Sequence, residues 1–162
     1  MNEKEPMTLA GYEKISKELE QLKNVERNKI AAEIATATDH GDLKENAEYH
    51  AAKEKQVIME KRLSLLQDYM GRAQVIDPSK LPHAKVSFGS TVKLLDLETE
   101  DEVEYTIVGG VESNVEKGMI SYQSPLARML MGKAEGHDFL ADLPNGVKEF
   151  EVLEVCYKPF EV

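Results

Sequence analysis

The sequence predicts an α+β fold, in which a long antiparallel α-helical coiled-coil hairpin precedes an antiparallel β-sheet domain with one short helix. Three observations support this class. Apolar residues recur every three or four positions over residues 8–72, a stretch without proline. Gly41 interrupts that pattern near its midpoint. After residue 75, short runs of alternating polar and apolar residues replace it, and glycines and prolines separate these runs.

The helical half carries start, turn and stop signals. Thr8 is a candidate N-cap, and Gly71 is a candidate C-terminal stop. A continuous helix is one alternative, but Gly41 followed by Asp42 favours a turn. Folding the chain back at this turn brings apolar positions opposite one another: Ile15 with Leu66, Leu22 with Met59, and Ile30 with Ala52. We therefore expect a coiled-coil domain over residues 1–77, with an acidic tip near residues 40–46.

The second half is typical of short strands around one helix. Pro78 and Pro82 mark a linker over residues 78–84, and the C-terminal domain then covers residues 85–162. Ser124 is a candidate N-cap, Pro125 suits the first position of a short helix, and Gly132 suits its end. Four strands are expected, over Thr91–Leu97, Val103–Val111, Met119–Tyr122 and Glu149–Tyr157.

The composition limits the class of protein. The net charge of −10 argues against a surface that binds nucleic acid throughout, but it is compatible with a local basic patch. The single cysteine, Cys156, supports neither a disulfide framework nor a zinc site. No apolar run reaches the ~20 residues of a membrane span, and the N-terminus has no signal-peptide core. We expect a cytoplasmic protein.

Two acidic residues at the expected turn allow two interpretations. Asp42 and Glu45 have the spacing of a capping box, in which Asp42 would cap the second helix and Glu45 would be its third residue. Alternatively, carboxylates at a helix N-terminus stay ionised and suit a hard cation such as Mg²⁺. Two carboxylates alone do not hold Mg²⁺ tightly, so a partner would have to supply the other ligands. The residue pattern leaves both interpretations open.

Basic residues flank the same turn. Lys44, Lys53 and Lys55 have the charge to attract an RNA backbone, or to form ordinary surface pairs with Glu48 and Glu54. The sequence contains no glycine-rich phosphate loop and no G-x-S-x-G nucleophile motif. The charged residues near the turn are therefore the candidate functional site that the sequence indicates.

Several segments, in this order along the chain, resemble the Gre family of bacterial transcript cleavage factors. They are PMTLAGYEKISKELEQLK, HGDLKENAEYHAA, AQVID, FGSTVKLLDL, YTIVG, SPLARMLMGK and FEVLEV, which together extend over nearly the whole chain. The resemblance implies that the C-terminal domain is FKBP-like. It also implies binding at the secondary channel of bacterial RNA polymerase, where the coiled coil enters and the C-terminal domain docks on the rim.

The resemblance also assigns roles to residues. Asp42 and Glu45 would help to hold a shared Mg²⁺ in the polymerase active site, so that the polymerase cleaves backtracked RNA near its 3′ end. The protein would then be a stimulator and not an enzyme, would bind no cofactor alone, and would be a monomer. The basic patch near the RNA would be Lys44, Lys53 and Lys55. The polymerase-docking residues would be Ser124, Pro125, Leu126, Ala127 and Leu130.

One stretch departs from the family pattern. Members often carry an arginine shortly before HGD, whereas this chain reads ATATDHGD. The resemblance therefore implies a weaker contact with RNA and activity on shorter backtracked ends. Two other functions stay open at this point. They are an FKBP-like prolyl isomerase or chaperone, and a related secondary-channel factor that inhibits the polymerase.

Overall fold

The computed structural model describes residues 3–41 and 45–162, and the chain forms two compact units. The hairpin unit comprises Met1–Glu3 and Tyr12–Ala73. The sheet unit comprises Lys4–Gly11 and Gln74–Val162, so a short N-terminal segment belongs with the second half of the chain. Each unit has its own buried apolar cluster.

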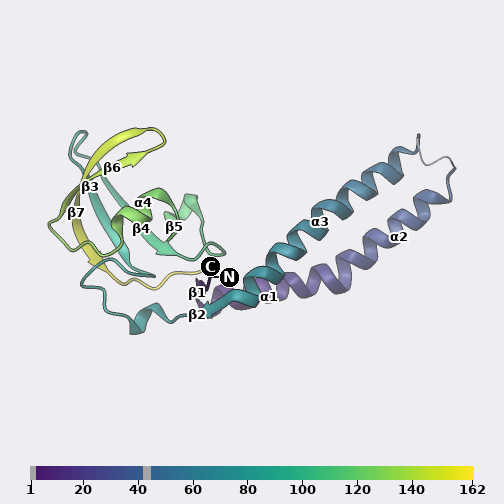
Figure 1. Ribbon diagram of the computed structural model, residues 1–162, viewed down its shortest axis with the longest axis horizontal. Coiled ribbons are helices and arrows are strands. Elements are labelled where there is room, and N and C mark those ends of the chain that lie inside the picture. Colours follow the sequence, from purple (N-terminus) through teal and green to yellow (C-terminus); the bar gives the residue numbers. More distant parts are fainter. Residues whose placement is uncertain (1–2, 42–44) are drawn as a thin grey trace. The chain divides into compact units, whose positions relative to one another are not determined.

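The hairpin unit consists of helices that run as two antiparallel arms (Figure 1). The first arm comprises α1 (Leu9–Gln21), the π-helical segment η1 (Leu22–Glu26) and α2 (Arg27–Thr38). The second arm is α3 (Ala47–Arg72), whose 26 residues make it about 39 Å long. The predicted hairpin is therefore confirmed, and a single continuous helix is excluded. Periodicity did not predict the π-helical segment, which interrupts the first arm.

An apolar seam joins the two arms. Ile30 of α2 clusters with Met59 and Leu63 of α3, and all three side chains are buried. Exposed ion pairs cross between the arms, namely Arg62 with Glu18 at 2.7 Å, Arg27 with Glu60 at 2.9 Å and Lys55 with Glu33 at 3.3 Å. Exposed pairs of this kind contribute little to stability, typically below about 1 kcal/mol. Burial along the seam therefore holds the hairpin together.

The ends of the helical half were predicted with mixed success. The N–H of Gly11 donates to the hydroxyl oxygen of Thr8 at 3.1 Å, which confirms Thr8 as the N-cap. The expected stop at Gly71 is wrong, because α3 continues through Gly71 to Arg72. The chain leaves the helix where it enters strand β2 (Ala73–Val75), which pairs with strand β1 (Glu5–Met7). Strand pairing ends the helix here without a left-handed glycine.

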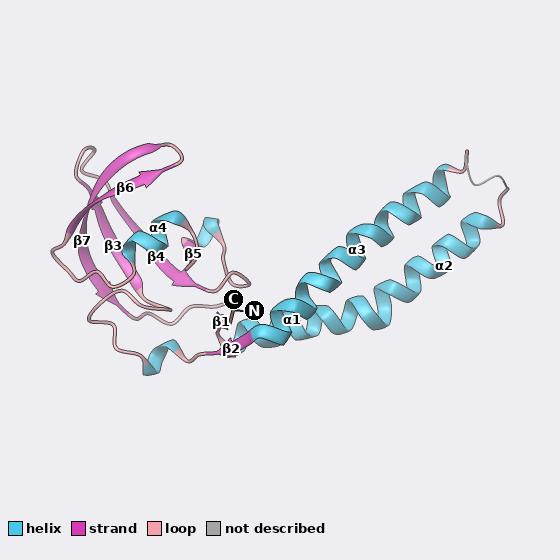
Figure 2. Ribbon diagram, in the orientation of Figure 1, coloured by secondary structure: helices cyan, strands magenta, loops and turns pink. Residues whose placement is uncertain are grey.

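The sheet unit contains a five-stranded sheet with the order β5-β4-β3-β7-β6 (Figure 2). Its strands are β3 (Thr91–Asp96), β4 (Glu102–Val108), β5 (Met119–Ser121), β6 (Asp138–Leu143) and β7 (Gly146–Cys156). The four predicted strands are present, and β6 is an additional one. The sheet is mixed, because β4 and β5 pair in parallel. The prediction of a purely antiparallel sheet is therefore wrong in this one pairing.

The short helix α4 (Pro125–Leu130) forms as predicted. Ser124 accepts a hydrogen bond from the N–H of Ala127 at 3.3 Å, and Gly132 adopts a φ of 84° just after the helix. Ala127 and Leu130 pack into the same core as Leu94, Ile107 and Val152 of the sheet. α4 therefore buries one face against the sheet.

Residues 78–84, between the helical half and the sheet-forming half, have structure of their own. They include a 3₁₀ turn, η2 (Pro78–Lys80), whose cap is Asp77. The ring of His83 lies 2.6 Å from the hydroxyl of Ser90 and 2.7 Å from the carbonyl oxygen of Pro78. These contacts tie the segment to the start of the sheet. Within the described residues, no helix has both the length and the apolar character needed to cross a membrane.

Candidate functional site

The hairpin tip is organised by Asn46, the residue that precedes α3. Its side-chain oxygen accepts a hydrogen bond from the N–H of Tyr49 at 3.1 Å, which is the geometry of an N-cap. Its side-chain amide donates to the carbonyl oxygen of Ala37, near the end of α2, at 2.6 Å. One side chain thus caps the second arm and contacts the first.

The capping-box interpretation of the tip acids is therefore wrong. The second long helix begins at Ala47, so Glu45 lies before the cap and is not the third residue of the helix. Asn46 takes the role expected of Asp42 because its oxygen reaches the N–H of Tyr49 three residues later. Glu45 is exposed. Asp42 and Lys44 themselves lie outside the described residues.

A polar pocket of about 410 Å³ opens beside the cap. Its lining residues are His40, Glu45, Asn46, Ala47 and Glu48. Two carboxylates, those of Glu45 and Glu48, therefore border the same space. No group of three or more potential metal ligands occurs among residues 3–41 and 45–162. The described part of the tip thus brings two carboxylates, those of Glu45 and Glu48, to one pocket.

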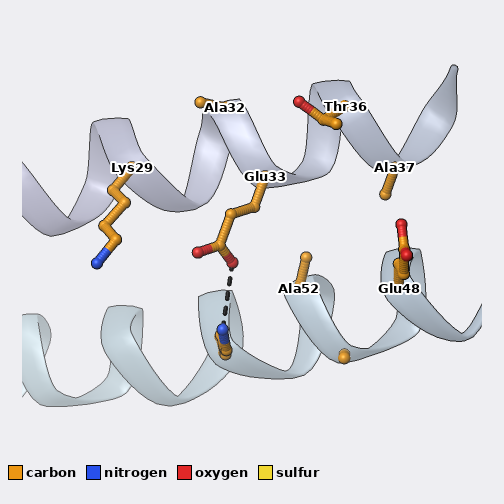
Figure 3. Close-up of a pocket in the computed structure, with 9 residues that line it drawn as sticks. Lys29, Ala32, Glu33, Thr36, Ala37, Glu48 and Ala52 are labelled. Carbon is orange, nitrogen blue, oxygen red and sulfur yellow. Dashed lines mark hydrogen bonds and ion pairs between the residues drawn. The ribbon is translucent and has the colours of Figure 1, made fainter.

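A groove between α2 and α3 continues from the tip along the hairpin (Figure 3). Its volume is about 560 Å³, and small side chains such as Ala32, Thr36 and Ala52 line it. The ion pair between Lys55 and Glu33 crosses this groove at 3.3 Å. These small side chains leave the groove between the two arms open near the tip.

Two of the three predicted basic residues are described. Lys55 is committed to the ion pair with Glu33. Lys53 approaches the side-chain oxygen of Gln56 at 3.4 Å, and its ammonium lies 5.9 Å from the centre of the Tyr49 ring. The ring of Tyr49 in turn packs edge-on against His50, with centroids 5.6 Å apart. Lys53 is therefore exposed on α3 with the ring of Tyr49 nearby.

The predicted docking residues on α4 fall into two groups. Pro125 is exposed, and Ser124 and Leu126 are partly exposed. Ala127 and Leu130 are fully buried, so their side chains are unavailable to a partner. The residue pattern of the segment suggested one continuous surface, but the helix must bury one side against the sheet. Of the predicted docking residues, Ser124, Pro125 and Leu126 are therefore the ones whose side chains a partner could reach.

Sequence reasoning missed two tip residues. Asn46 belongs to the residue types preferred at N-caps, and that preference was the signal that could have located the start of α3. Glu48 was interpreted only as a partner for a lysine. It lines both the tip pocket and the groove, so it is a further carboxylate at the tip.

Comparison with known proteins decides the family. The model for the N-terminal part of GreA/GreB transcription elongation factors matches residues 5–75. The model for the C-terminal part of the same factors matches residues 81–157. The chain belongs to the GreA/GreB family of transcription elongation factors. Its function is that of a transcription elongation factor of the transcript cleavage type.

Curated relatives agree over nearly their full length. The chain is 63% identical to transcription elongation factor GreA of Nitratiruptor sp. over 99% of this chain and 98% of the relative. It is 57% identical to GreA of Wolinella succinogenes, with 96% of each chain covered. Among solved structures, GreA factor homolog 1 of Thermus thermophilus is 26% identical, with 94% of this chain and 99% of that chain covered at a TM-score of 0.44. The relatives do not favour the prolyl isomerase alternative.

Proposed function

We propose that this Gre factor inserts its hairpin tip into the secondary channel of bacterial RNA polymerase and stimulates cleavage of backtracked RNA. The observation that carries the proposal is the position of Glu45. It is exposed and lies directly before Asn46, the N-cap of a helical arm about 39 Å long, so the carboxylate of Glu45 is not needed for capping. Such an arm can present a carboxylate deep inside another protein.

The tip residues fit a role as partial ligands of an ion that the polymerase binds. Mg²⁺ is commonly held by one or two protein carboxylates, with water and phosphate completing its octahedral shell. Glu45 and Asp42 would supply that carboxylate contribution, and Glu48 borders the same pocket as Glu45. When bound, Mg²⁺ polarises the phosphate and orients a water for attack. The protein acts only as a stimulator, because the remaining ligands and the RNA belong to the polymerase complex.

The tip also offers limited contact with RNA. Lys53 would contact a phosphate, and the Tyr49 ring beside it would stack on a base. Lys55 contributes less, because Glu33 already neutralises it. Lys44 completes the proposed patch. This sparse set supports a preference for short backtracked ends.

The sheet unit would hold the polymerase at the rim of the channel. Pro125, with Ser124 and Leu126 beside it, is the exposed part of α4. Arg128 is also exposed on this helix and adds a cation next to the apolar surface. Arginine beside apolar anchors is typical of interface centres. In this arrangement docking and cleavage use different residues of a monomer.

A stalled polymerase complex tests the proposal. The complex carries end-labelled RNA, is backtracked by nucleotide starvation, and receives Mg²⁺ with or without the protein. We expect shortened RNA and resumed elongation only when the protein is present. An unchanged RNA length at saturating protein would contradict the proposal, and slower intrinsic cleavage would instead indicate an inhibitory factor.

A further inference from the structure

Asn46 makes two side-chain hydrogen bonds that have different structural consequences. Its oxygen caps α3 through the N–H of Tyr49 at 3.1 Å. Its amide nitrogen donates to the carbonyl oxygen of Ala37 at 2.6 Å, across the chain turn. Only this orientation of the amide turns its NH₂ group to the carbonyl oxygen of Ala37 and its oxygen to the N–H of Tyr49. The cap stabilises one helix, whereas the second bond joins two helices.

The carbonyl of Ala37 is a firm anchor for that second bond. Ala37 is 2% exposed and lies one residue before the end of α2. Its carbonyl is among the last four of the helix, which have no partner within the helix itself. It accepts from the N–H of His40 at 3.1 Å as well as from Asn46. The end of α2 and the start of α3 are thus linked directly.

We propose that Asn46 is a positioning residue for the carboxylate of Glu45, acting through its bond to Ala37. This inference rests on the proposed function. Glu45 is the residue before Asn46, so fixing Asn46 against α2 restricts where the Glu45 backbone lies relative to the hairpin axis. A displacement of about 1 Å at a reacting centre can cost about 100-fold in rate. A bond of this kind thus affects the cleavage rate more than it affects the binding of the hairpin.

Other capping residues lack the second bond. Aspartate and serine cap helices about as well as asparagine. Aspartate has no amide to donate to Ala37, and its carboxylate would repel the carbonyl oxygen and add a charge next to Glu45. Serine is too short to cap Tyr49 and contact Ala37 together. The variants Asn46→Asp and Asn46→Ser therefore retain the cap and remove the link.

The test uses the full-length chain and a backtracked polymerase complex. We expect both variants to lower the maximal cleavage rate at saturating protein by about tenfold or more, with the half-saturating concentration changed by less than about twofold. The matched control is Asn28→Asp. Asn28 is exposed on α2 and its amide donates within that arm, to the carbonyl oxygen of Asn24 at 3.0 Å. This control should retain the wild-type maximal rate.

Side-chain amide exchange by NMR tests the bond itself, independently of folding effects in the variants. One Asn46 side-chain amide proton of the wild type should exchange more slowly than those of Asn28. Equal exchange, wild-type maximal rates in both Asn46 variants, or a change confined to the half-saturating concentration would each overturn the inference. Failure of the wild type to stimulate cleavage would instead remove the proposed function, and the inference with it.

Discussion

The buried carboxylate of Glu112 accepts hydrogen bonds from both the backbone N–H and the hydroxyl of Thr8, the N-cap of α1. The N–H distance is 3.2 Å, and the N–H of Gly109 also donates to Glu112 at 3.2 Å. The side chain of Glu112 is almost fully buried, with 3% exposed. Within the sheet unit, this acid therefore holds the N-terminal segment by hydrogen bonds.

Burial should make stability depend on the ionisation of Glu112. Desolvation raises the pKa of Glu112, and the bonds from Thr8 and Gly109 oppose this only in part. The folded state then binds the proton more tightly than the unfolded state, so stability falls as pH rises from about 4.3, the ordinary value, through the raised pKa. Glu112→Gln has no titrating carboxyl at this position, so it should remove this dependence of stability on pH. In urea unfolding at several pH values, the free energy of unfolding of the variant should rise relative to that of the wild type as pH rises.

A direct titration is the check on that prediction. Carbon-13 NMR of the Glu112 carboxyl should give a pKa above that of exposed glutamates in the same spectrum. A carboxyl that titrates in or below the ordinary range would contradict the prediction, as would a stability difference that does not vary with pH.

Close packing near Glu112 leaves no room for a side chain at Gly109. A Cβ at Gly109 would lie 2.4 Å from the backbone carbonyl oxygen of Pro6. Backbone cannot move aside cheaply, so Gly109→Ala should destabilise the protein by about 1–3 kcal/mol. Gly71→Ala is the control, since Gly71 is exposed within α3 and a Cβ added there would meet no heavy atom within 4 Å. This change should stabilise by about 0.5–1 kcal/mol, because alanine is the better helix former.

Thermal unfolding measures both changes. The melting temperature should fall for Gly109→Ala and rise slightly for Gly71→Ala. Equal effects of the two substitutions would show that the contact at Gly109 relaxes without cost.

Docking through α4 predicts a loss of affinity without a loss of maximal rate. Pro125→Glu places a charge on the proposed surface, and glutamate is well tolerated in the first turn of a helix, so the fold should persist. We expect the protein concentration for half-maximal cleavage to rise about tenfold, as for an interface anchor. Val115→Glu is the control, because Val115 is 85% exposed elsewhere in the sheet unit. A matching loss in the control would mean that added charge, and not the docking surface, causes the effect.

Periodic and local signals predicted much of this structure, and packing decided the rest. The apolar spacing around Ile30 and Met59 indicated the hairpin, because a buried seam needs that spacing. Ser124 and Pro125 located the start of α4, because a serine N-cap followed by proline is a local signal for the first turn of a helix. The parallel pairing of β4 with β5 depends on contacts distant in sequence, which alternation along one strand does not encode.

At the tip, too, local signals predicted part of the structure and packing decided the rest. Asp42 and Asn46 are both good capping residues, and local pattern alone favoured the one nearer the glycine. The contact of Asn46 with Ala37 in the other arm is what favours Asn46. Glu112 was not singled out from the sequence, since its partner Thr8 lies 104 residues away along the chain and becomes a neighbour only in the fold.

The most direct test of the central claim separates binding from cleavage at the tip acids. Asp42→Asn and Glu45→Gln should each abolish stimulated cleavage in a backtracked complex, while competing with the wild type for polymerase at nearly unchanged affinity. Glu54→Gln is the control, because Glu54 is an exposed acid on α3 outside the proposed tip set, and it should retain activity. Full stimulation by both tip variants would contradict the account, and so would loss of activity that follows loss of polymerase binding.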